Sequence, residues 1–335
     1  MIDRIISASV RHKLITGLLL LALMGWGAYS ITQLPIDALP DVTNNQVLVN
    51  TVAPNLATQE VEQFITFPLE QAFKNLPDVV ELRSVSRSGL SVVTVVFKDE
   101  VPVNVARQLI GERITQVQDA IPSGYGRPEL APPTTGTGEI YQYTLAVDSA
   151  HRDRYDLMEL RTMQDWIVRR QLLGVQGVID VSSFGGLLKQ YEVSVDARRI
   201  AGAGLTLIDV FTALENNNGN TGGSYIEKGP NIYFIRGEGI VTSLKDMENI
   251  VVSARGGSPV RIRDVAEVKF GHAVRYGALT RNGEGEAVGG VVLMLKGANA
   301  LATVNAVKER MSEVQRSLPE GVHVDAFVDR TKLVD

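Results

Sequence analysis

The hydrophobic pattern changes its period several times along the chain, and the first change predicts a membrane helix. Residues 14–31 are 18 consecutive residues without a charge, close to the ~20 that cross a hydrocarbon core as a helix. Three basic residues lie within the first 13 positions, and the first charge after the run is Asp37. The positive-inside tendency therefore predicts a cytoplasmic N-terminus and places the residues after 31 outside.

A cleaved signal peptide is the alternative for this run. Ala28 and Ser30 satisfy a small-x-small cleavage pattern after a basic segment. The run is longer than the ~7–15 apolar residues of a usual signal peptide. Residues 1–9 also carry apolar positions at helical spacing, as a short interfacial helix would. We therefore favour a retained membrane anchor.

Beyond a proline-containing linker at 32–45, the pattern alternates between strand and helix periods. The order is β-α-β-β-α, the beginning of a split βαβ, ferredoxin-like unit. The predicted elements are a strand at 46–52, a helix at 57–76, strands at 79–86 and 90–97, and a helix at 103–121.

A second unit of the same kind follows and is interrupted by a segment of different texture, residues 198–272. After the insertion, the second unit continues with a hairpin that has an Asn-Gly turn at 282–283, then an amphipathic helix and a strand. Aligning residues 76–82 with 175–181 suggests an internal duplication, although junctions this short also match by chance. The earlier predicted elements are a strand at 140–147, a helix at 155–173, and a strand pair at 178–184 and 189–195.

These elements predict an α+β protein with one N-terminal transmembrane helix and two ferredoxin-like units. The interrupting segment includes a hairpin at 219–239. The predicted boundaries are a cytoplasmic segment at 1–12, the membrane helix at 13–31, the linker at 32–45, a first unit at 46–130, a second unit at 131–197 and 273–329, an inserted subdomain at 198–272, and a last segment at 330–335.

Composition narrows the functions that remain. The chain has no cysteine, which excludes disulfides and thiolate metal sites. Its net charge of −5 argues against a broad nucleic-acid surface. Metalloprotease, phosphate-loop and nucleophile-elbow motifs are absent from the sequence. We therefore expect neither an enzyme nor a bound cofactor.

Glu139 is the main candidate for chemistry. It stands where the loop PPTTGTG enters a strand whose next residues are apolar or aromatic, and a carboxylate there offers an oxygen ligand to a divalent cation. A solvated strand-end glutamate is the alternative. Asp165, on the helix at 155–173, is a weaker candidate for the same role. The methionines form no soft-metal cluster and are typical of core gap-fillers.

The combination resembles a known family. The segments LPIDALPDVTNNQVLVNT, FPLEQAFKNLPDV, SVSRSGLSVVTVVF, GTGEIYQYTL, DWIVRRQLL and YGALTRNGEGEAVGGVVLML resemble the resistance-nodulation-division transporters, and most closely their heavy-metal efflux branch, of cobalt-zinc-cadmium type. The resemblance runs from residue 1 to residue 335. It implies a proton-driven pump of the bacterial inner membrane that exports divalent metal cations.

The resemblance also implies partners. Such pumps are homotrimers that work with a periplasmic adaptor, or membrane fusion protein, and an outer-membrane channel. The two ferredoxin-like units would be porter subdomains, and the inserted subdomain, with its hairpin at 219–239, would be the docking subdomain. Glu139 falls in the segment that contributes a carboxylate to a periplasmic cation site in zinc-type members.

Two other functions stay open at this stage. In the family, VDRTKLVD leads into a second membrane helix and the proton-relay residues lie later still; the apolar run at 14–31 carries no side chain able to relay protons. We therefore expect an N-terminal portion of a pump. The alternatives are an anchored periplasmic scaffold or adaptor, and a multidrug-type exporter, which would favour a pocket richer in aromatic residues.

Overall fold

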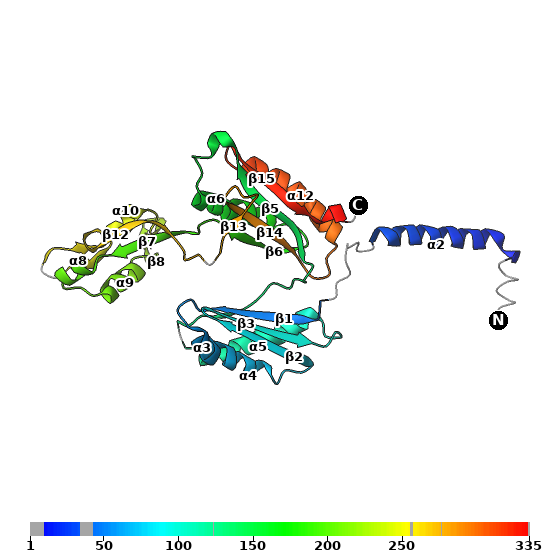
Figure 1. The fold of residues 1–335 in the computed structure, drawn as a ribbon, viewed down its shortest axis with the longest axis horizontal. Coiled ribbons are helices and arrows are strands. Elements are labelled where there is room, and N and C mark those ends of the chain that lie inside the picture. Colours follow the sequence, from blue (N-terminus) through cyan, green and yellow to red (C-terminus); the bar gives the residue numbers. More distant parts are fainter. Residues whose placement is uncertain (1–9, 34–42, 123, 255–256, 276, 334–335) are drawn as a thin grey trace.

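A computed structural model describes residues 10–33, 43–122, 124–254, 257–275 and 277–333, with the side chains of 31–33 and 332–333 left aside. Helix α2 (Lys13–Gln33) projects from one end of the molecule, and the inserted unit lies at the opposite end (Figure 1). Residues 1–9, most of the expected linker and residues 334–335 lie outside the described residues, and so do the predictions made for them.

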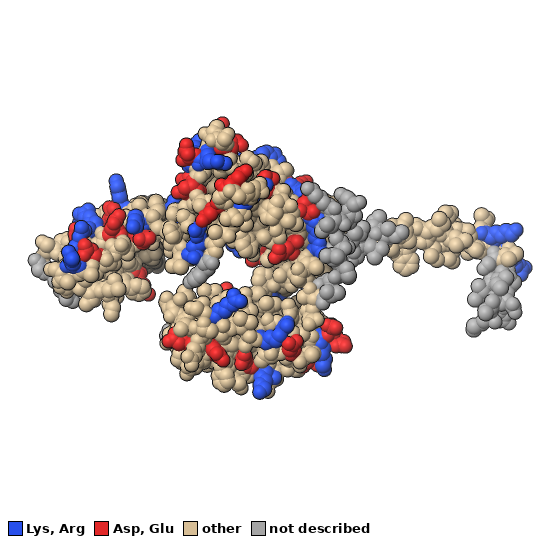
Figure 2. All heavy atoms as spheres, in the orientation of Figure 1, with Lys and Arg blue, Asp and Glu red and all other residues tan. Residues whose placement is uncertain are grey.

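Helix α2 has the length and composition of a membrane span. Residues Lys13–Ser30 are apolar enough to cross a membrane, and none of this segment is buried against the rest of the protein. Figure 2 shows it as a span without charged side chains between a basic end and the remainder of the chain. A signal sequence near an N-terminus meets the same criteria. The structure thus contains the expected helix.

The first folded unit, named unit 1, has the order β-α-β-β-α-β. Its sheet runs β2-β3-β1-β4 with all neighbouring strands antiparallel. The first helix contains one π turn. The elements are β1 (Gln46–Val52), α3 (Thr58–Val61), the π turn η1 (Glu62–Thr66), α4 (Phe67–Phe73), β2 (Val79–Arg87), β3 (Leu90–Phe97), α5 (Val103–Val117), the 3₁₀ turn η2 (Gln118–Ala120) and β4 (Pro128–Leu130).

Unit 2 repeats this order around the insertion. Its sheet runs β6-β14-β5-β15, the same arrangement as in unit 1, with the short β13 beside β14. The elements are β5 (Glu139–Val147), the 3₁₀ turn η3 (Ser149–His151), α6 (Leu157–Met163), the π turn η4 (Gln164–Val168), α7 (Arg169–Leu172), β6 (Val178–Gly185), β13 (Leu279–Thr280), β14 (Glu286–Met294), α12 (Ala300–Ser317), β15 (Val322–Asp329) and η6 (Arg330–Leu333).

The inserted unit has a core of its own and a protruding hairpin, the β8–β9 pair. Its elements are β7 (Lys189–Val195), α8 (Ala197–Gly202), α9 (Leu207–Asn216), β8 (Thr221–Lys228), β9 (Asn231–Gly237), α10 (Leu244–Glu248), β10 (Val251–Ser253), β11 (Val260–Arg261), α11 (Ile262–Val265) and β12 (Ala266–His272).

The strand pair expected from residues 178–184 and 189–195 does not form. Strand β6 pairs with β14, and β7 pairs with β12 along its whole length. The insertion in the structure therefore begins before Lys189 and not after residue 197. Periodicity identified both strands, but it carries no information about which distant strand each one joins. The Asn-Gly turn is confirmed, because Asn282 and Gly283 both have positive φ.

Candidate functional site

Strand β5 begins with the candidate carboxylate and crosses the centre of the sheet of unit 2. Its register with β14 shifts between Val292 and Leu293, so Ile140 is the extra residue of a β-bulge. The bulge places Glu139 and Gln142 on one face of the sheet, although the two residues are three apart. Helices α6, α7 and α12 cover the opposite face, where Tyr143 packs in the core.

The Glu139 carboxylate is exposed and lies beside the Gln142 amide. Gln142 Nε2 donates to Glu139 Oε2 over 2.8 Å. A carboxylate held by an amide and open to water can give oxygen to a divalent cation. No group of three or more histidine, aspartate or glutamate side chains that could hold a metal lies within the described part of the chain. Glu139 thus stands as a single exposed carboxylate and belongs to no cluster of candidate ligands in the described part of the chain.

Asp165 has a different environment. Arg161 Nε lies 2.8 Å from Asp165 Oδ2, and the two side chains are only 21% and 20% exposed. Ser183 Oγ donates to Asp165 Oδ1 over 2.5 Å. Arg161 also donates to the Gly185 carbonyl oxygen over 2.7 Å. Both oxygens of Asp165 are therefore engaged within the protein, which favours a structural role for this carboxylate.

A buried hydrogen-bond network extends from Asp165 into the core. Gln164, in the π turn η4, accepts from Tyr143 Oη over 3.0 Å, and its amide donates to Ser183 Oγ over 3.3 Å. Tyr143 and Gln164 are both fully buried. Burial raises the pKa of the Tyr143 phenol far above its ordinary value, more than the hydrogen bond to Gln164 lowers it. The hydroxyl therefore stays protonated and donates.

Gly290 makes room for this network. A Cβ atom at Gly290 would stand 2.5 Å from Tyr143 Oη and 2.7 Å from Gln164 Nε2. Both distances are shorter than any real carbon contact, so a side chain at this position would displace the hydrogen-bonded pair. The sequence gives two adjacent glycines in a strand, Gly289 and Gly290, which is a recognisable signal of close approach.

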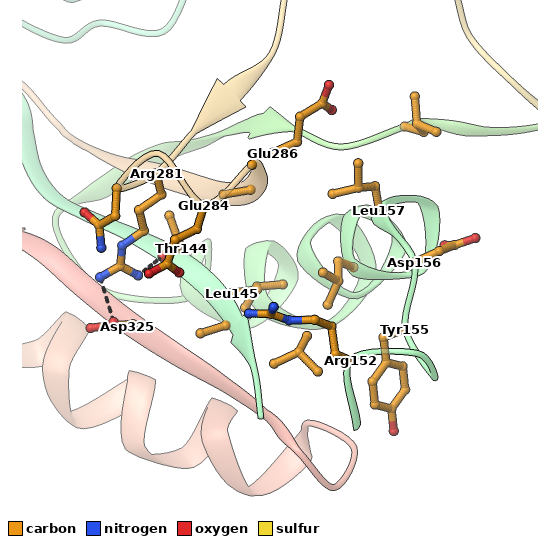
Figure 3. Close-up of a pocket in the computed structure, with 17 residues that line it drawn as sticks. Thr144, Leu145, Arg152, Tyr155, Asp156, Leu157, Arg281, Glu284, Glu286 and Asp325 are labelled. Atoms are coloured by element: carbon orange, nitrogen blue, oxygen red, sulfur yellow. Dashed lines mark hydrogen bonds and ion pairs between the residues drawn. The ribbon is translucent and has the colours of Figure 1, made fainter. Parts of the chain in front are cut away.

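A cavity of about 680 Å³ lies at the other end of β5, around Thr144–Val147 (Figure 3). Asp156, Glu286 and Asp325, three of the acidic residues that line it, have partners in the structure. Arg281 lies 2.7 Å from Asp325 and also donates to Thr144 Oγ1. The Asp156 carboxylate accepts from two backbone amides at the start of α6. This arrangement gives the cavity mixed charge, and Glu139 is not among its lining residues.

Sequence reasoning missed two residues that bear on Glu139. Strict alternation along β5 places Gln142 and Glu139 on opposite faces of the sheet, because it takes no account of the bulge at Ile140. Arg330 is 5% exposed and donates to the Thr137 carbonyl oxygen, two residues before Glu139. The interaction joins residues 193 positions apart, and no local pattern signals it.

The β8–β9 hairpin is the second exposed feature with functional character. All of its residues are solvent-exposed, including apolar ones, and Phe234 is 83% exposed. Isolated two-stranded hairpins are marginally stable in water, and clustered exposed apolar residues mark contact surfaces. The hairpin thus presents apolar side chains on an exposed surface.

The chain was compared with known proteins. The family model for the AcrB/AcrD/AcrF family matches residues 5–335. The chain is 44% identical over 339 residues to the cation efflux system protein CzcA of Alcaligenes sp. (strain CT14), a match that covers 100% of this chain and 32% of that protein. It is 39% identical over 336 residues to the cation efflux system protein CusA of Escherichia coli (strain K12), again covering 32% of that protein.

Solved structures give the same result. Two crystal forms of a heavy metal efflux pump match with TM-scores of 0.87 and 0.88 at 34% identity. The matches cover 97% and 99% of this chain and 32% of the pump chain. The chain thus spans about a third of the length of the relatives that it matches.

Proposed function

Because this chain belongs to the AcrB/AcrD/AcrF family, a family of transporters and not of enzymes, we propose that it is the N-terminal part of a heavy-metal efflux pump. The pump would export divalent cations such as zinc, cobalt or cadmium in exchange for protons. The observation that carries this proposal is that the whole of this chain matches cation efflux proteins, at up to 44% identity. The exposed carboxylate of Glu139 supports it.

We assign helix α2 to the bacterial inner membrane. Its uncharged span and the aromatic residues Trp26 and Tyr29 near its outer end suit a helix anchored at an interface. Basic residues at its N-terminal end favour a cytoplasmic N-terminus. Units 1 and 2 would then lie in the periplasm. The proton relay belongs to a part of the pump outside this chain, because residues 14–31 carry no ionisable group except Tyr29.

Units 1 and 2 fit the role of ferredoxin-like porter subdomains, since they share one strand order and each covers one sheet face with helices. The inserted unit fits a docking subdomain. Its exposed β8–β9 hairpin has the apolar residues that contact with a neighbouring subunit or an outer-membrane channel requires. In this proposal the pump is a homotrimer that works with a periplasmic adaptor.

Glu139 would be a cation ligand completed by residues from the remainder of the pump. An oxygen ligand suits zinc, cobalt or cadmium better than copper(I) or silver, which prefer sulfur. Gln142 supports the assignment, because its hydrogen bond to one carboxylate oxygen orients the ligand as groups around metal sites do. Asp165 is the weaker candidate, since Arg161 and Ser183 already occupy its oxygens.

The test is the growth of cells that depend on this pump, in rising concentrations of zinc, cobalt and cadmium. We expect Glu139→Gln to lower resistance to at least one cation without lowering protein abundance. Glu129→Gln, which removes an exposed glutamate from β4 of unit 1, is the matched control. Unchanged resistance to all three cations in Glu139→Gln would remove Glu139 from the site.

A further inference from the structure

The loop just before Glu139 contacts distant parts of the chain. It spans residues 132–138 and connects unit 1 to unit 2. A loop this short, bonded at several points, has little freedom, so its bonds fix the start of β5. The Gly136 amide donates to Thr43 Oγ1 over 3.1 Å, the Lys296 amide donates to the Pro133 oxygen over 3.1 Å, and Arg330 donates to the Thr137 oxygen.

The turn itself is tight. The Gly138 amide donates to the Thr135 carbonyl oxygen over 2.9 Å. A Cβ atom at Gly138 would stand 2.0 Å from Thr134 Oγ1 and 3.0 Å from the Thr135 carbonyl oxygen, so a side chain at this position would require Thr134 to move. Glu139 follows immediately. Any change in the turn is therefore passed directly to the backbone that carries the carboxylate.

Arg330 is the only charged side chain that the structure shows bonded to this turn in the described residues. It is 5% exposed and comes directly after β15. A buried guanidinium is unfavourable unless acceptors surround it, and the Thr137 oxygen is one of them. Burial and this bond together hold the side chain in one place.

The residues beside Arg330 are fixed to helix α12. Lys308 Nζ lies 2.5 Å from Asp329 Oδ2 and donates to Thr331 Oγ1 over 2.7 Å. Thr331 is 7% exposed. Residues 329–331 thus form a rigid base, from which the Arg330 side chain reaches the turn before β5.

We propose that Arg330 is a positioning residue for Glu139. It holds the turn at Thr137 and so sets where the Glu139 carboxylate stands, and it joins this position to the segment that follows β15. The proposal rests on the proposed role of Glu139 as a cation ligand. Arg330 itself does not touch the cation.

Hydrogen–deuterium exchange of the whole chain in detergent tests the mechanical part. We expect Arg330→Gln to speed exchange in residues 132–138 on the order of tenfold, the effect of losing one charged hydrogen bond. Arg330→Lys, which keeps a charged donor, should restore part of the protection. Arg316→Gln, an exposed position on α12, is the matched control. Unchanged exchange in the loop, or a uniform increase across unit 2, would overturn the proposal.

Calorimetric titration with Cd²⁺ alone, of the same variants made in the natural-length product of the gene encoding this chain, tests the functional part. We expect Glu139→Gln and Arg330→Gln to weaken binding and Arg330→Lys to recover part of it. If Glu139→Gln binds Cd²⁺ as the unmodified chain does, the proposed ligand fails, whatever Arg330 does to the loop. If Glu139→Gln weakens binding and Arg330→Gln does not, the positioning role fails and the ligand stands.

Discussion

The centres of units 1 and 2 occupy the same places in the strand register and differ in chemistry. In unit 1, Val93 of β3 lies between Val49 of β1 and Ser84 of β2. In unit 2, Gly290 of β14 takes the place of Val93, between Tyr143 of β5 and Ser183 of β6. Two valines in unit 1 therefore correspond to one tyrosine and one glycine in unit 2.

The helices of the two units differ in the same way, with an apolar residue in unit 1 and a polar one in unit 2. Ile65 of η1 and Gln164 of η4 are 99 residues apart, the spacing that also relates Ser84 to Ser183. Ile65 and Gln164 are both fully buried. Unit 1 thus has an apolar layer where unit 2 has a tyrosine hydrogen-bonded to a glutamine. One fold accepts either layer because the large tyrosine is matched by a glycine, which preserves the packed volume.

The polar layer of unit 2 is connected to the point where the inserted unit begins. The polar layer of unit 2 continues through Ser183 to Asp165 and Arg161, and Arg161 holds the Gly185 oxygen where the chain leaves for the inserted unit. In unit 1, Thr66 stands 99 residues before Asp165, and the bonds of its hydroxyl in the described residues are to neutral groups, the hydroxyls of Ser86 and Ser91 and the Val61 carbonyl oxygen. The unit that carries an insertion therefore has the charged network.

Gly290→Val should have the largest effect on stability, because it introduces the valine of unit 1 while the neighbouring Tyr143 and Gln164 of unit 2 remain. The new side chain would overlap Tyr143 Oη and Gln164 Nε2. We expect a loss of about 3 kcal/mol or more in the unfolding free energy of unit 2, measured by exchange of the β14 amides in the whole chain.

Completing the exchange should reverse this loss. The triple variant Tyr143→Val, Gln164→Ile and Gly290→Val installs the whole layer of unit 1, and an apolar layer can replace a satisfied polar one at little cost. If the triple variant is as unstable as Gly290→Val alone, the two layers are not equivalent and the comparison is broken.

Asp165→Ala should have the next largest effect. It leaves Arg161 partly buried without its carboxylate, for which we expect a loss of about 2 kcal/mol. Thr66→Ala at the matching position of unit 1 removes neutral hydrogen bonds and should cost about 1 kcal/mol. Protection of the amides in β6 and β2 measures the two losses. Equal losses would mean that the charge of the network in unit 2 has no particular importance.

A smaller effect distinguishes the units by pH. Lys308 on α12 bonds the Asp329 carboxylate, whereas Arg107 on α5 donates to the Ala131 carbonyl oxygen over 2.6 Å. Burial alone would raise the pKa of Asp329, but hydrogen bonds from Lys308 and Thr331 outweigh it and lower the pKa. The unfolded chain therefore binds the proton more readily. The stabilisation is present above about pH 4, the ordinary range of Asp, and is lost as pH falls through the folded value.

We expect about 1 kcal/mol of such acid-sensitive stability in unit 2 and none at the Arg107 contact, whose acceptor does not titrate. Exchange of the β15 and β4 amides between pH 3 and 6 measures both. Lys308→Met should reduce the dependence in unit 2, because only the hydrogen bonds from Thr331 then lower the pKa of Asp329. A dependence that is unchanged in Lys308→Met would assign it to another group.

Local patterns predicted much of this architecture. The helices at 58–73 and 157–172 follow from apolar positions at helical spacing, and the turn at Asn282 follows from its sequence. Strand pairing across the insertion did not follow, because the partners of β6 and β7 are set by contacts about 75 to 110 residues away. At the site, the spacing of Arg161 and Asp165 at i and i+4 was a readable signal of an ion pair. The contact of Arg330 with Thr137 had none.

The most direct measurement is cadmium uptake by inverted membrane vesicles that contain the natural-length product of the gene encoding this chain. The account predicts uptake driven by acidification of the vesicle interior, reduced on the order of tenfold, or about 1.4 kcal/mol, in Glu139→Gln and unchanged in Glu129→Gln. Uptake that is equal in all three proteins would contradict the role of Glu139, and absence of proton-driven uptake in the unmodified protein would contradict the proposed function.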